Sequence, residues 1–309
     1  MISIYKKSDE GLQEINTIEK DCWIYATEPN FVELNEISKI LDIPEEFLTD
    51  PLDIDERPRI EIEDDHILII LRIPYYDKDH PKIPYNTIPL GIIYSPDAII
   101  TICSMETEIL STFLDRRIKN FSLINKERFI LLIFLRTAIL FLKFLKQINN
   151  MTNELEKELH ESMKNQKLVN LLDAQKSLVY FTTSLRANEI MIGRLSVSKK
   201  FKISAEERDL LEDVEVEYRQ ATEMANVYSN ILSGMMNAFA SLISNNLNAV
   251  MKFLASITLV LMLPNLVASV YGMNIQLPFQ DSPFAFPITM AISILLAGLG
   301  AYFFLKKKT

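Results

Sequence analysis

Residues 253–270, FLASITLVLMLPNLVASV, carry no formal charge, and residues 282–305, SPFAFPITMAISILLAGLGAYFFL, repeat this property near the C-terminus. Either stretch is long enough to cross the roughly 30 Å hydrocarbon core of a bilayer as a helix. The two stretches therefore predict a pair of membrane-spanning helices at the C-terminal end of the chain.

The charges around the two stretches predict their orientation. Residues 271–281, which join them, contain no Lys or Arg, whereas Lys306, Lys307 and Lys308 follow the second stretch. By the positive-inside rule, the C-terminus lies in the cytoplasm and the connection lies outside. Two spans return the chain to its starting side, and no cleavable signal is visible at the start. We expect a multi-pass protein of the plasma or inner membrane with both termini in the cytoplasm.

A third apolar stretch, residues 129–145, has a different character. Arg136 sits at its centre, and Lys143 and Lys146 lie near its end. A central Arg raises the free energy of a membrane helix by about 3 kcal/mol or more. We therefore interpret this stretch as a buried helix of the soluble body.

Composition limits the function classes. The 309 residues have a formal net charge of −9, with 49% hydrophobic and 24% charged residues, which is typical of a soluble body joined to a small membrane part. An acidic chain repels phosphates, so we expect no nucleic-acid partner. The sequence contains neither a phosphate-binding loop nor a nucleophile arrangement, so we expect neither an enzyme nor a bound cofactor. The cysteines are expected to be free thiols. No metal-ligand spacing occurs among Cys22, Cys103, His66, His80 and His160.

Residues 1–125 are predicted to form a cytoplasmic α/β domain. Between residues 37 and 48, apolar side chains recur at helical spacing. Pro and Asp punctuate three short apolar runs, as turns between strands require. The runs that predict strands are residues 67–71, 92–94 and 98–102.

Helical composition begins near residue 126. Residues 126–202 predict a helical hairpin region, with candidate breaks at Asn149-Asn150 and at residues 197–200. A further helix is expected to begin near Ser204, where Glu207 completes a capping box.

Nothing obvious stops this last helix before Tyr271, so we assign it residues 203–271. At 1.5 Å per residue it would be roughly 100 Å long, too long for a globular core. We interpret it as a stalk whose end, about residues 248–271, is the first span. An external connection (272–282), a second span (283–305) and a basic cytoplasmic tail (306–309) would follow.

Two interleaved series with seven-residue spacing mark one face of the first span. One series is Asn248, Ala255, Met262 and Ser269, and the other is Met251, Thr258, Asn265 and Gly272. Polar groups inside a span face protein or water. The face can therefore line a pore or pack against another helix, and spacing alone does not choose between these. Because two spans cannot enclose a channel, a pore would require several copies of the chain.

The first span ends in Tyr271-Gly272-Met273-Asn274. At this position, the outer end of the penultimate span, Gly-Met-Asn resembles the hallmark of the CorA family of divalent metal ion (magnesium) transporters. The resemblance extends through residues 248–252 and 57–61, and so over the whole chain. It implies an α+β cytoplasmic domain, a long stalk helix and two C-terminal transmembrane helices, assembled as a homopentamer.

The resemblance also implies a function. The chain would form a Mg²⁺ uptake channel, with divalent metal ions, the lipid bilayer and further copies of itself as partners. Gly272, Met273 and Asn274 would form a selectivity mouth. The pore-lining residues would be Asn248, Met251, Leu254, Ala255, Thr258, Met262, Asn265 and Ser269.

Neutral oxygens suit such a mouth because Mg²⁺ gives up its water reluctantly. A ring of Asn274 side chains can hydrogen-bond the hydration shell and release the ion again; outside the family context, Asn274 would simply cap a helix. Met251, Leu254 and Met262 can form apolar constrictions that gate by dewetting. Thioether ligation of a soft metal and simple packing are the alternatives.

The start of the stalk carries a run of acidic residues. Residues 206–217 hold seven acids and one base, which by itself indicates a solvated helix face. By its distance from Gly-Met-Asn, Asp213 matches an acid that in similar channels helps bind a regulatory Mg²⁺ between subunits. The resemblance assigns the partner role to Glu63, Asp64 and Asp65 of a neighbouring subunit.

Two departures from the family pattern leave other functions open. Residues 275–280 replace a Met-Pro-Glu segment, and Asn237 stands where some relatives have a carboxylate. Zinc, cobalt or nickel transport is therefore the first alternative. A membrane-anchored sensor or scaffold is an alternative of another class, although an anchor needs neither the polar series nor Gly-Met-Asn.

Overall fold

The computed structural model describes residues 1–8, 11–77, 83–114, 122–161, 165–275, 277–278 and 282–306. The predictions made for His80, for the side chain of His160, for residues 276 and 279–281 of the connection and for Lys307 and Lys308 fall outside the described residues. The chain forms two compact units, Met1–Gly234 and Met235–Thr309.

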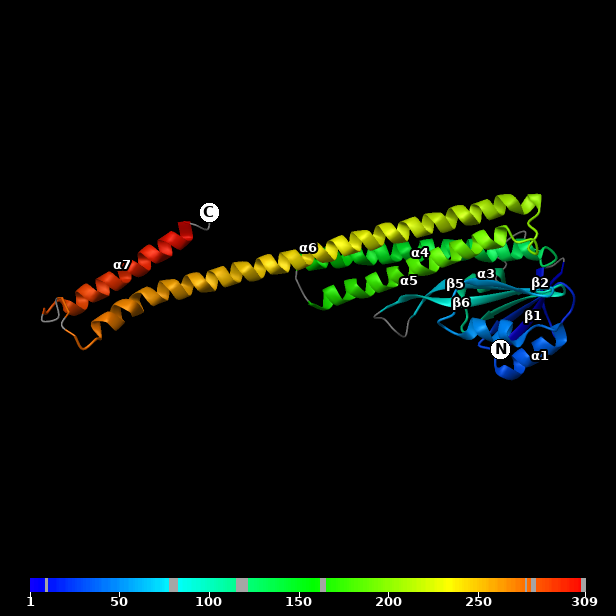
Figure 1. The fold of residues 1–309 in the computed structure, drawn as a ribbon, viewed down its shortest axis with the longest axis horizontal. Helices are drawn as coiled ribbons and strands as arrows, with labels where there is room; N and C mark the ends of the chain where they lie inside the picture. The colour runs from blue at the N-terminus through cyan, green and yellow to red at the C-terminus, as the bar shows by residue number, and fades with distance from the viewer. Residues whose placement is uncertain are drawn as a thin grey trace. The chain divides into compact units, whose positions relative to one another are not determined.

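A seven-stranded sheet lies at the centre of the first unit, in the order β2-β1-β3-β7-β6-β5-β4 (Figure 1). β3 and β7 pair in parallel, and every other neighbouring pair is antiparallel. The three predicted strands are confirmed, since they lie in β5, β6 and β7. The strands are β1 (Ile2–Ser8), β2 (Gly11–Ile15), β3 (Cys22–Thr27), β4 (Arg59–Glu63), β5 (His66–Tyr76), β6 (Tyr85–Tyr94) and β7 (Ala98–Cys103).

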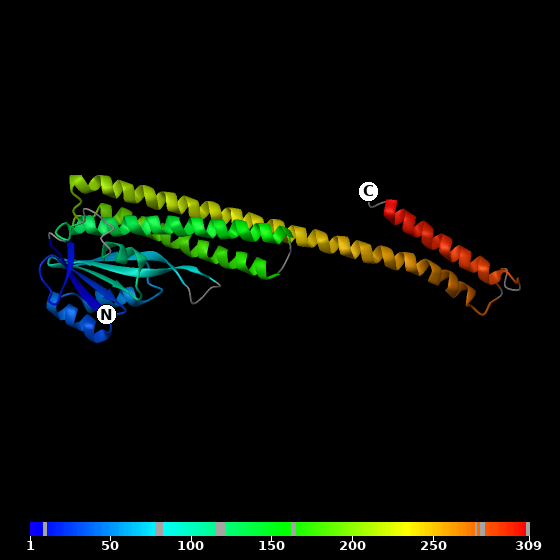
Figure 2. The same cartoon turned by 180° about the vertical axis from the view of Figure 1, so that it is seen from behind.

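Helices cover both faces of this sheet (Figures 1 and 2). Side chains alternate between the faces along each strand, as β3 illustrates. Ile24 joins a buried cluster with Ile37 and Phe47 from the first two helices. Its neighbour Trp23 points to the other face, where its ring centroid lies 5.3 Å from that of Phe129. The body therefore has a core on either side of the sheet.

The helical spacing predicted for residues 37–48 belongs to two helices rather than one. α1 (Phe31–Leu41) ends at Asp42, whose φ of 53° is left-handed. α2 (Glu45–Thr49) begins after Pro44, and a short 3₁₀ turn, η1 (Asp50–Leu52), follows it. Proline disfavours helical backbone at the residue before it, and together with the left-handed Asp42 it separates α1 from α2. The helical spacing expected from the sequence is therefore present, divided between two helices.

The helical region begins with α3 (Glu108–Leu114), α4 (Lys126–Glu161) and α5 (Asn165–Ser196). Residues 129–145 are confirmed as a helix of the soluble body, because most of their apolar side chains are buried in it. The break predicted at Asn149-Asn150 was wrong, since α4 continues through it with Ile148 and Thr152 both buried. Burial of these neighbours outweighs the weak helix propensity of asparagine. The break at residues 197–200 is confirmed by the end of α5.

α6 (Ala205–Tyr271) is a single helix of 67 residues that continues through Pro264. It begins directly after Ser204, whose hydroxyl contacts the Glu207 carboxylate. Glu207 is buried and also accepts a hydrogen bond of 2.8 Å from the Asn125 side chain. The start of α6 is therefore tied to the start of α4. α7 (Ala285–Lys306) is the last helix that the structure describes.

Candidate functional site

The Gly-Met-Asn segment directly follows the last turn of α6. The Gly272 N–H donates to the Ala268 carbonyl at 2.9 Å, and the Met273 N–H donates to the Val270 carbonyl at 3.3 Å. A Cβ added at Gly272 would lie 3.3 Å from the Ala268 carbonyl oxygen, so the turn leaves little space there. Asn274 is exposed in the single chain. A compact turn thus presents a neutral carboxamide at the end of the span.

The predicted pore-lining residues share one face of α6 in the second unit. Each is exposed in the single chain, including Met251 at 59% and Met262 at 60%. The set is Asn248, Met251, Leu254, Ala255, Thr258, Met262, Asn265 and Ser269, and we call it the polar face.

A different face of α6 meets α7. The half-buried residues of this stretch include Ser256, Val260, Leu263 and Val267, which are spaced by four, three and four residues. A Cβ added at Gly300 of α7 would approach the Leu263 Cδ1 to 3.0 Å. At 100° per residue, this row lies roughly 150° around the helix axis from the centre of the polar face. The polar face is therefore not used for packing within the hairpin.

The polar face carries oxygen atoms that can accept hydrogen bonds. The Thr258 hydroxyl donates its proton to the Leu254 carbonyl of its own helix at 2.9 Å. Its oxygen keeps free lone pairs toward the outside of α6. Such an oxygen can accept from the water shell of a passing cation without adding a charge.

α6 and α7 are the two described helices that are long and apolar enough to cross a membrane. None of the residues in the most apolar window of α6 is buried, and 6% are buried in that of α7. Apolar surface of this extent must be buried against lipid or protein. Lipid tails suit the apolar sides of both helices, whereas the polar face needs protein or water.

The residues predicted to hold a regulatory ion lie on two separate elements of the first unit. Glu63 ends β4, and Asp64 and Asp65 form the tight turn to β5, where Asp64 has a left-handed φ of 47°. Asp213 is an exposed residue on the first part of α6. Within the described part of one chain, no three acidic, His or Cys side chains gather as a metal site. A site made from these residues would need a second copy of the chain.

Within the single chain, the Lys200 side chain contacts the turn between β4 and β5. Its ammonium lies 3.6 Å from an Asp65 carboxylate oxygen and contacts the Asp64 carbonyl. A divalent cation that binds these carboxylates must therefore compete with a lysine.

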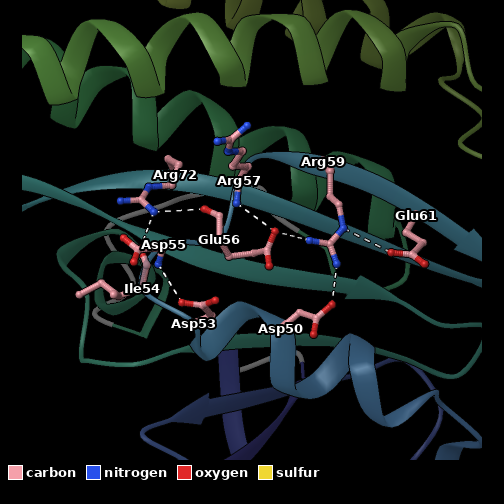
Figure 3. Close-up of polar contacts among 9 residues, drawn as sticks. All are labelled: Asp50, Asp53, Ile54, Asp55, Glu56, Arg57, Arg59, Glu61 and Arg72. Carbon is pink, nitrogen blue, oxygen red and sulfur yellow. Dashed lines mark hydrogen bonds and ion pairs between the residues drawn. The ribbon is translucent and has the colours of Figure 1, made fainter.

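An ion-pair cluster holds β4, the strand that leads into this turn (Figure 3). Arg59 contacts Glu56, and its guanidinium lies 2.5 Å from Asp50 and 3.3 Å from Glu61. Burial alone lowers the pKa of Arg59, but the contacts with Asp50, Glu56 and Glu61 outweigh it and raise this pKa above its ordinary value. The cluster fixes an edge strand that has one strand neighbour.

A second arginine holds the loop before β4 (Figure 3). The Arg72 guanidinium donates to the Ile54 carbonyl at 2.6 Å and to the Glu56 carbonyl at 3.1 Å. Burial lowers the pKa of Arg72, and the nearby Asp55, Tyr75 and Asp53 offset only part of this effect. The backbone of Arg72 is paired as well, because Asn188 of α5 accepts from its N–H and donates to its carbonyl.

Sequence reasoning missed the roles of Arg59, Arg72 and Asn188. A signal existed for Arg72, because a single cation ends the apolar run of β5 and must find partners inside the body. No comparable signal existed for Asn188, which is a polar residue in a helix of mixed composition.

Comparison with known proteins agrees with the predicted resemblance. Residues 19–307 match the family described as CorA-like Mg²⁺ transporter protein. The cobalt/magnesium transport protein CorA of Methanocaldococcus jannaschii is 28% identical over 292 residues, which cover 91% of this chain and 89% of that protein. Its namesake from Thermotoga maritima is 22% identical over 265 residues, 84% of this chain and 75% of that protein.

A solved structure matches the fold of this chain over nearly the whole length of both proteins. The complete structure of the CorA magnesium transporter from Methanocaldococcus jannaschii has a TM-score of 0.85 at 26% identity, covering 98% of this chain and 97% of that chain. The predicted fold class is confirmed: an α+β body, a long helix and two C-terminal apolar helices. The chain therefore belongs to the family of CorA-like Mg²⁺ transporter proteins.

Proposed function

We propose that the protein is a homopentameric channel that takes up Mg²⁺ through a pore lined by the polar face of α6. The observation that carries this proposal is the position of that face, which lies away from α7 and is exposed in one chain. Lipid tails cannot satisfy Asn248, Thr258, Asn265 and Ser269. Copies of α6 arranged around an axis would turn these groups toward a shared water-filled path.

The mouth of this pore would be the ring of Gly272, Met273 and Asn274. The turn at Gly272 places the Asn274 carboxamide directly after the span. A carboxamide oxygen accepts from a bound water but carries no full charge, so it attracts a hydrated cation weakly enough to release it. This matches the reluctance of Mg²⁺ to lose its water shell.

No energy source beyond the ion gradient is needed for uptake. An inside-negative potential favours entry of a divalent cation by about 4.6 kcal/mol per 100 mV, twice the value for a single charge. The mouth would then face outward, and the soluble body and both termini would lie in the cytoplasm. Mg²⁺ is in this account the transported ion and, at the stalk, a regulatory ligand.

Ion flux into proteoliposomes tests the proposal directly. Purified protein should admit Mg²⁺ in preference to Co²⁺, Ni²⁺ and Zn²⁺, and it should sediment or scatter light as a pentamer in mild detergent. Flux no greater than that of empty liposomes would instead favour a membrane-anchored sensor or scaffold. A monomer in mild detergent would contradict a shared pore.

Cobalt is the second candidate ion. Two relatives are named as cobalt/magnesium transport proteins. Met251 and Met262 also expose thioethers on the polar face, and thioethers suit softer metals better than Mg²⁺. Co²⁺ flux above Mg²⁺ flux in the same assay would favour this second candidate.

We further propose that intracellular Mg²⁺ closes the channel by binding between subunits. Asp213 of one copy would meet Glu63, Asp64 and Asp65 of the next. Carboxylates brought together repel one another until a divalent cation relieves the repulsion. Bound Mg²⁺ would hold the stalks together, and its loss would loosen them.

This regulation predicts a change in feedback rather than in conduction. Asp213→Ala, or Asp64→Ala together with Asp65→Ala, should raise the internal Mg²⁺ concentration that half-inhibits flux by about tenfold or more, because each change removes a ligand. Glu223→Ala is the matched control, since it removes another exposed carboxylate of α6. Unchanged inhibition in both Asp variants would place the regulatory site elsewhere.

A further inference from the structure

The second unit also has a groove on the side of α6 that meets α7, and Ala255 at the edge of the polar face is among its lining residues. This groove of about 1100 Å³ runs beside α6 at the end of the spans away from Gly-Met-Asn. Ala249, Phe253 and Val260 line it from α6, and Ala301 and Phe304 line it from α7. Its volume exceeds that of most small-molecule pockets, which hold roughly 300–1,000 Å³. An apolar groove of this size is filled by apolar matter in a membrane.

One charged side chain lies on this groove. Lys252 is one of its lining residues and is exposed. It extends the row of Ser256, Val260 and Leu263 by one helical turn, where the apolar stretch ends. Among the described residues of this unit, no carboxylate is available to its ammonium, because their charged side chains are Lys252 and Lys306.

A second copy of the hairpin cannot supply the missing countercharge. Between residues 235 and 309 the sequence contains a single acid, Asp281, which is separated from Lys252 in the sequence by the whole first span. The α6–α7 hairpin of a second copy could fill the apolar part of the groove, but its described residues would leave the lysine without an anion. The occupant that satisfies both features has an apolar tail and an anionic head.

We propose that the groove between α6 and α7 binds an anionic phospholipid, with an acyl chain between Phe253, Ala301 and Phe304 and its phosphate at Lys252. The four-carbon stem of lysine lets the ammonium reach the headgroup level while its methylenes stay in apolar surroundings. The lipid fills a void that the two helices leave open. It also provides the anion that the described residues of this unit do not.

Native mass spectrometry of the detergent-solubilised protein tests this site. Titration with phosphatidylglycerol and with phosphatidylcholine counts the bound lipid and gives the affinity of each. We expect phosphatidylglycerol to bind about fivefold more tightly, the preference that one lysine near an anionic headgroup provides. Equal affinities would overturn the proposal.

Variants test the contact with the lipid headgroup and the contact with the acyl chain separately. Lys252→Gln should lower phosphatidylglycerol affinity to that of phosphatidylcholine, whereas Lys252→Arg should preserve the preference. Lys146→Gln, which removes an exposed lysine of α4 in the soluble body, is the matched control. Ala301→Phe should weaken both lipids, because its ring occupies the groove. Unchanged preference in Lys252→Gln, or unchanged binding of both lipids in Ala301→Phe, would contradict the site.

Inorganic phosphate distinguishes a lipid from a free anion. If the acyl chain contributes as proposed, phosphate added in excess should fail to displace phosphatidylglycerol. Displacement by phosphate alone would show that Lys252 binds anions without the groove and would overturn the lipid assignment. The readout is lipid binding, so the result does not depend on which ion the protein conducts.

Discussion

Asn274→Ala is expected to abolish Mg²⁺ flux while leaving the protein assembled in the membrane. The carboxamide is exposed in the single chain, so its removal creates no cavity. Each copy loses one hydrogen bond to the hydrated ion, worth about 1 kcal/mol. Over the proposed ring of five copies the loss approaches about 5 kcal/mol, or more than a thousandfold in rate if it falls on the barrier to entry. Fluorescent Mg²⁺ uptake into proteoliposomes measures the change.

Two further variants sharpen this test. Gly272→Ala should also reduce flux, because its Cβ would lie 3.3 Å from the Ala268 carbonyl and would displace the turn that carries Asn274. Leu295→Ala is the control, since Leu295 is 61% exposed on apolar α7 and lies outside the proposed pore. Wild-type flux from correctly assembled Asn274→Ala would show that this ring does not select the ion.

The fold class was predictable because membrane segments follow from simple physics. A bilayer tolerates few charges, so the uncharged stretches at residues 253–270 and 282–305 indicated α6 and α7 directly. Arg136 excluded the apolar stretch in α4 by the same argument. Gly-Met-Asn then indicated the family, because its position after α6 is more informative than the tripeptide itself.

The rest of the body depends on contacts between distant residues. β1 and β2 are half-exposed strands of mixed composition, and their pairing rather than their sequence defines them. α4 passes through Asn149-Asn150 because the flanking Ile148 and Thr152 are buried. Neither a local propensity nor a spacing rule contains this information.

Only part of the candidate site was predictable from the sequence. The seven-residue series identified the polar face of α6 but not its purpose, because packing and pore lining use the same residue types. The structure adds the row of Ser256, Val260 and Leu263, which meets α7 on another side of the helix. The place of Lys252 at an apolar groove could not be read from the sequence, because it depends on how α6 and α7 pack.

The protein is well suited to a cysteine-labelling test of the pore. Its native thiols, Cys22 and Cys103, are both free and buried. Burial raises the pKa of Cys22 and raises that of Cys103 to about 11. The thiolate is the reactive form, so both native cysteines stay protonated and unreactive near neutral pH. An introduced cysteine can therefore be followed without removing the native ones.

Thr258→Cys and Ile257→Cys form a matched pair for this test. The two positions are adjacent, so they lie at nearly the same depth, but their side chains point about 100° apart around the helix axis. Thr258 belongs to the polar face, whereas Ile257 is an apolar residue outside it. Both are exposed in the single chain, with Ile257 at 42%, so only an assembled pore would distinguish them.

A cationic, membrane-impermeant methanethiosulfonate reagent should block flux through Thr258→Cys and leave wild type and Ile257→Cys unaffected. The attached charge would stand in the path of a divalent cation inside the membrane. Repulsion of a few kcal/mol there reduces flux by about a hundredfold. Mass spectrometry of the treated protein reports labelling independently of flux. Equal labelling of both positions, or unlabelled Thr258→Cys in a protein that conducts normally, would contradict a water-filled path along the polar face of α6.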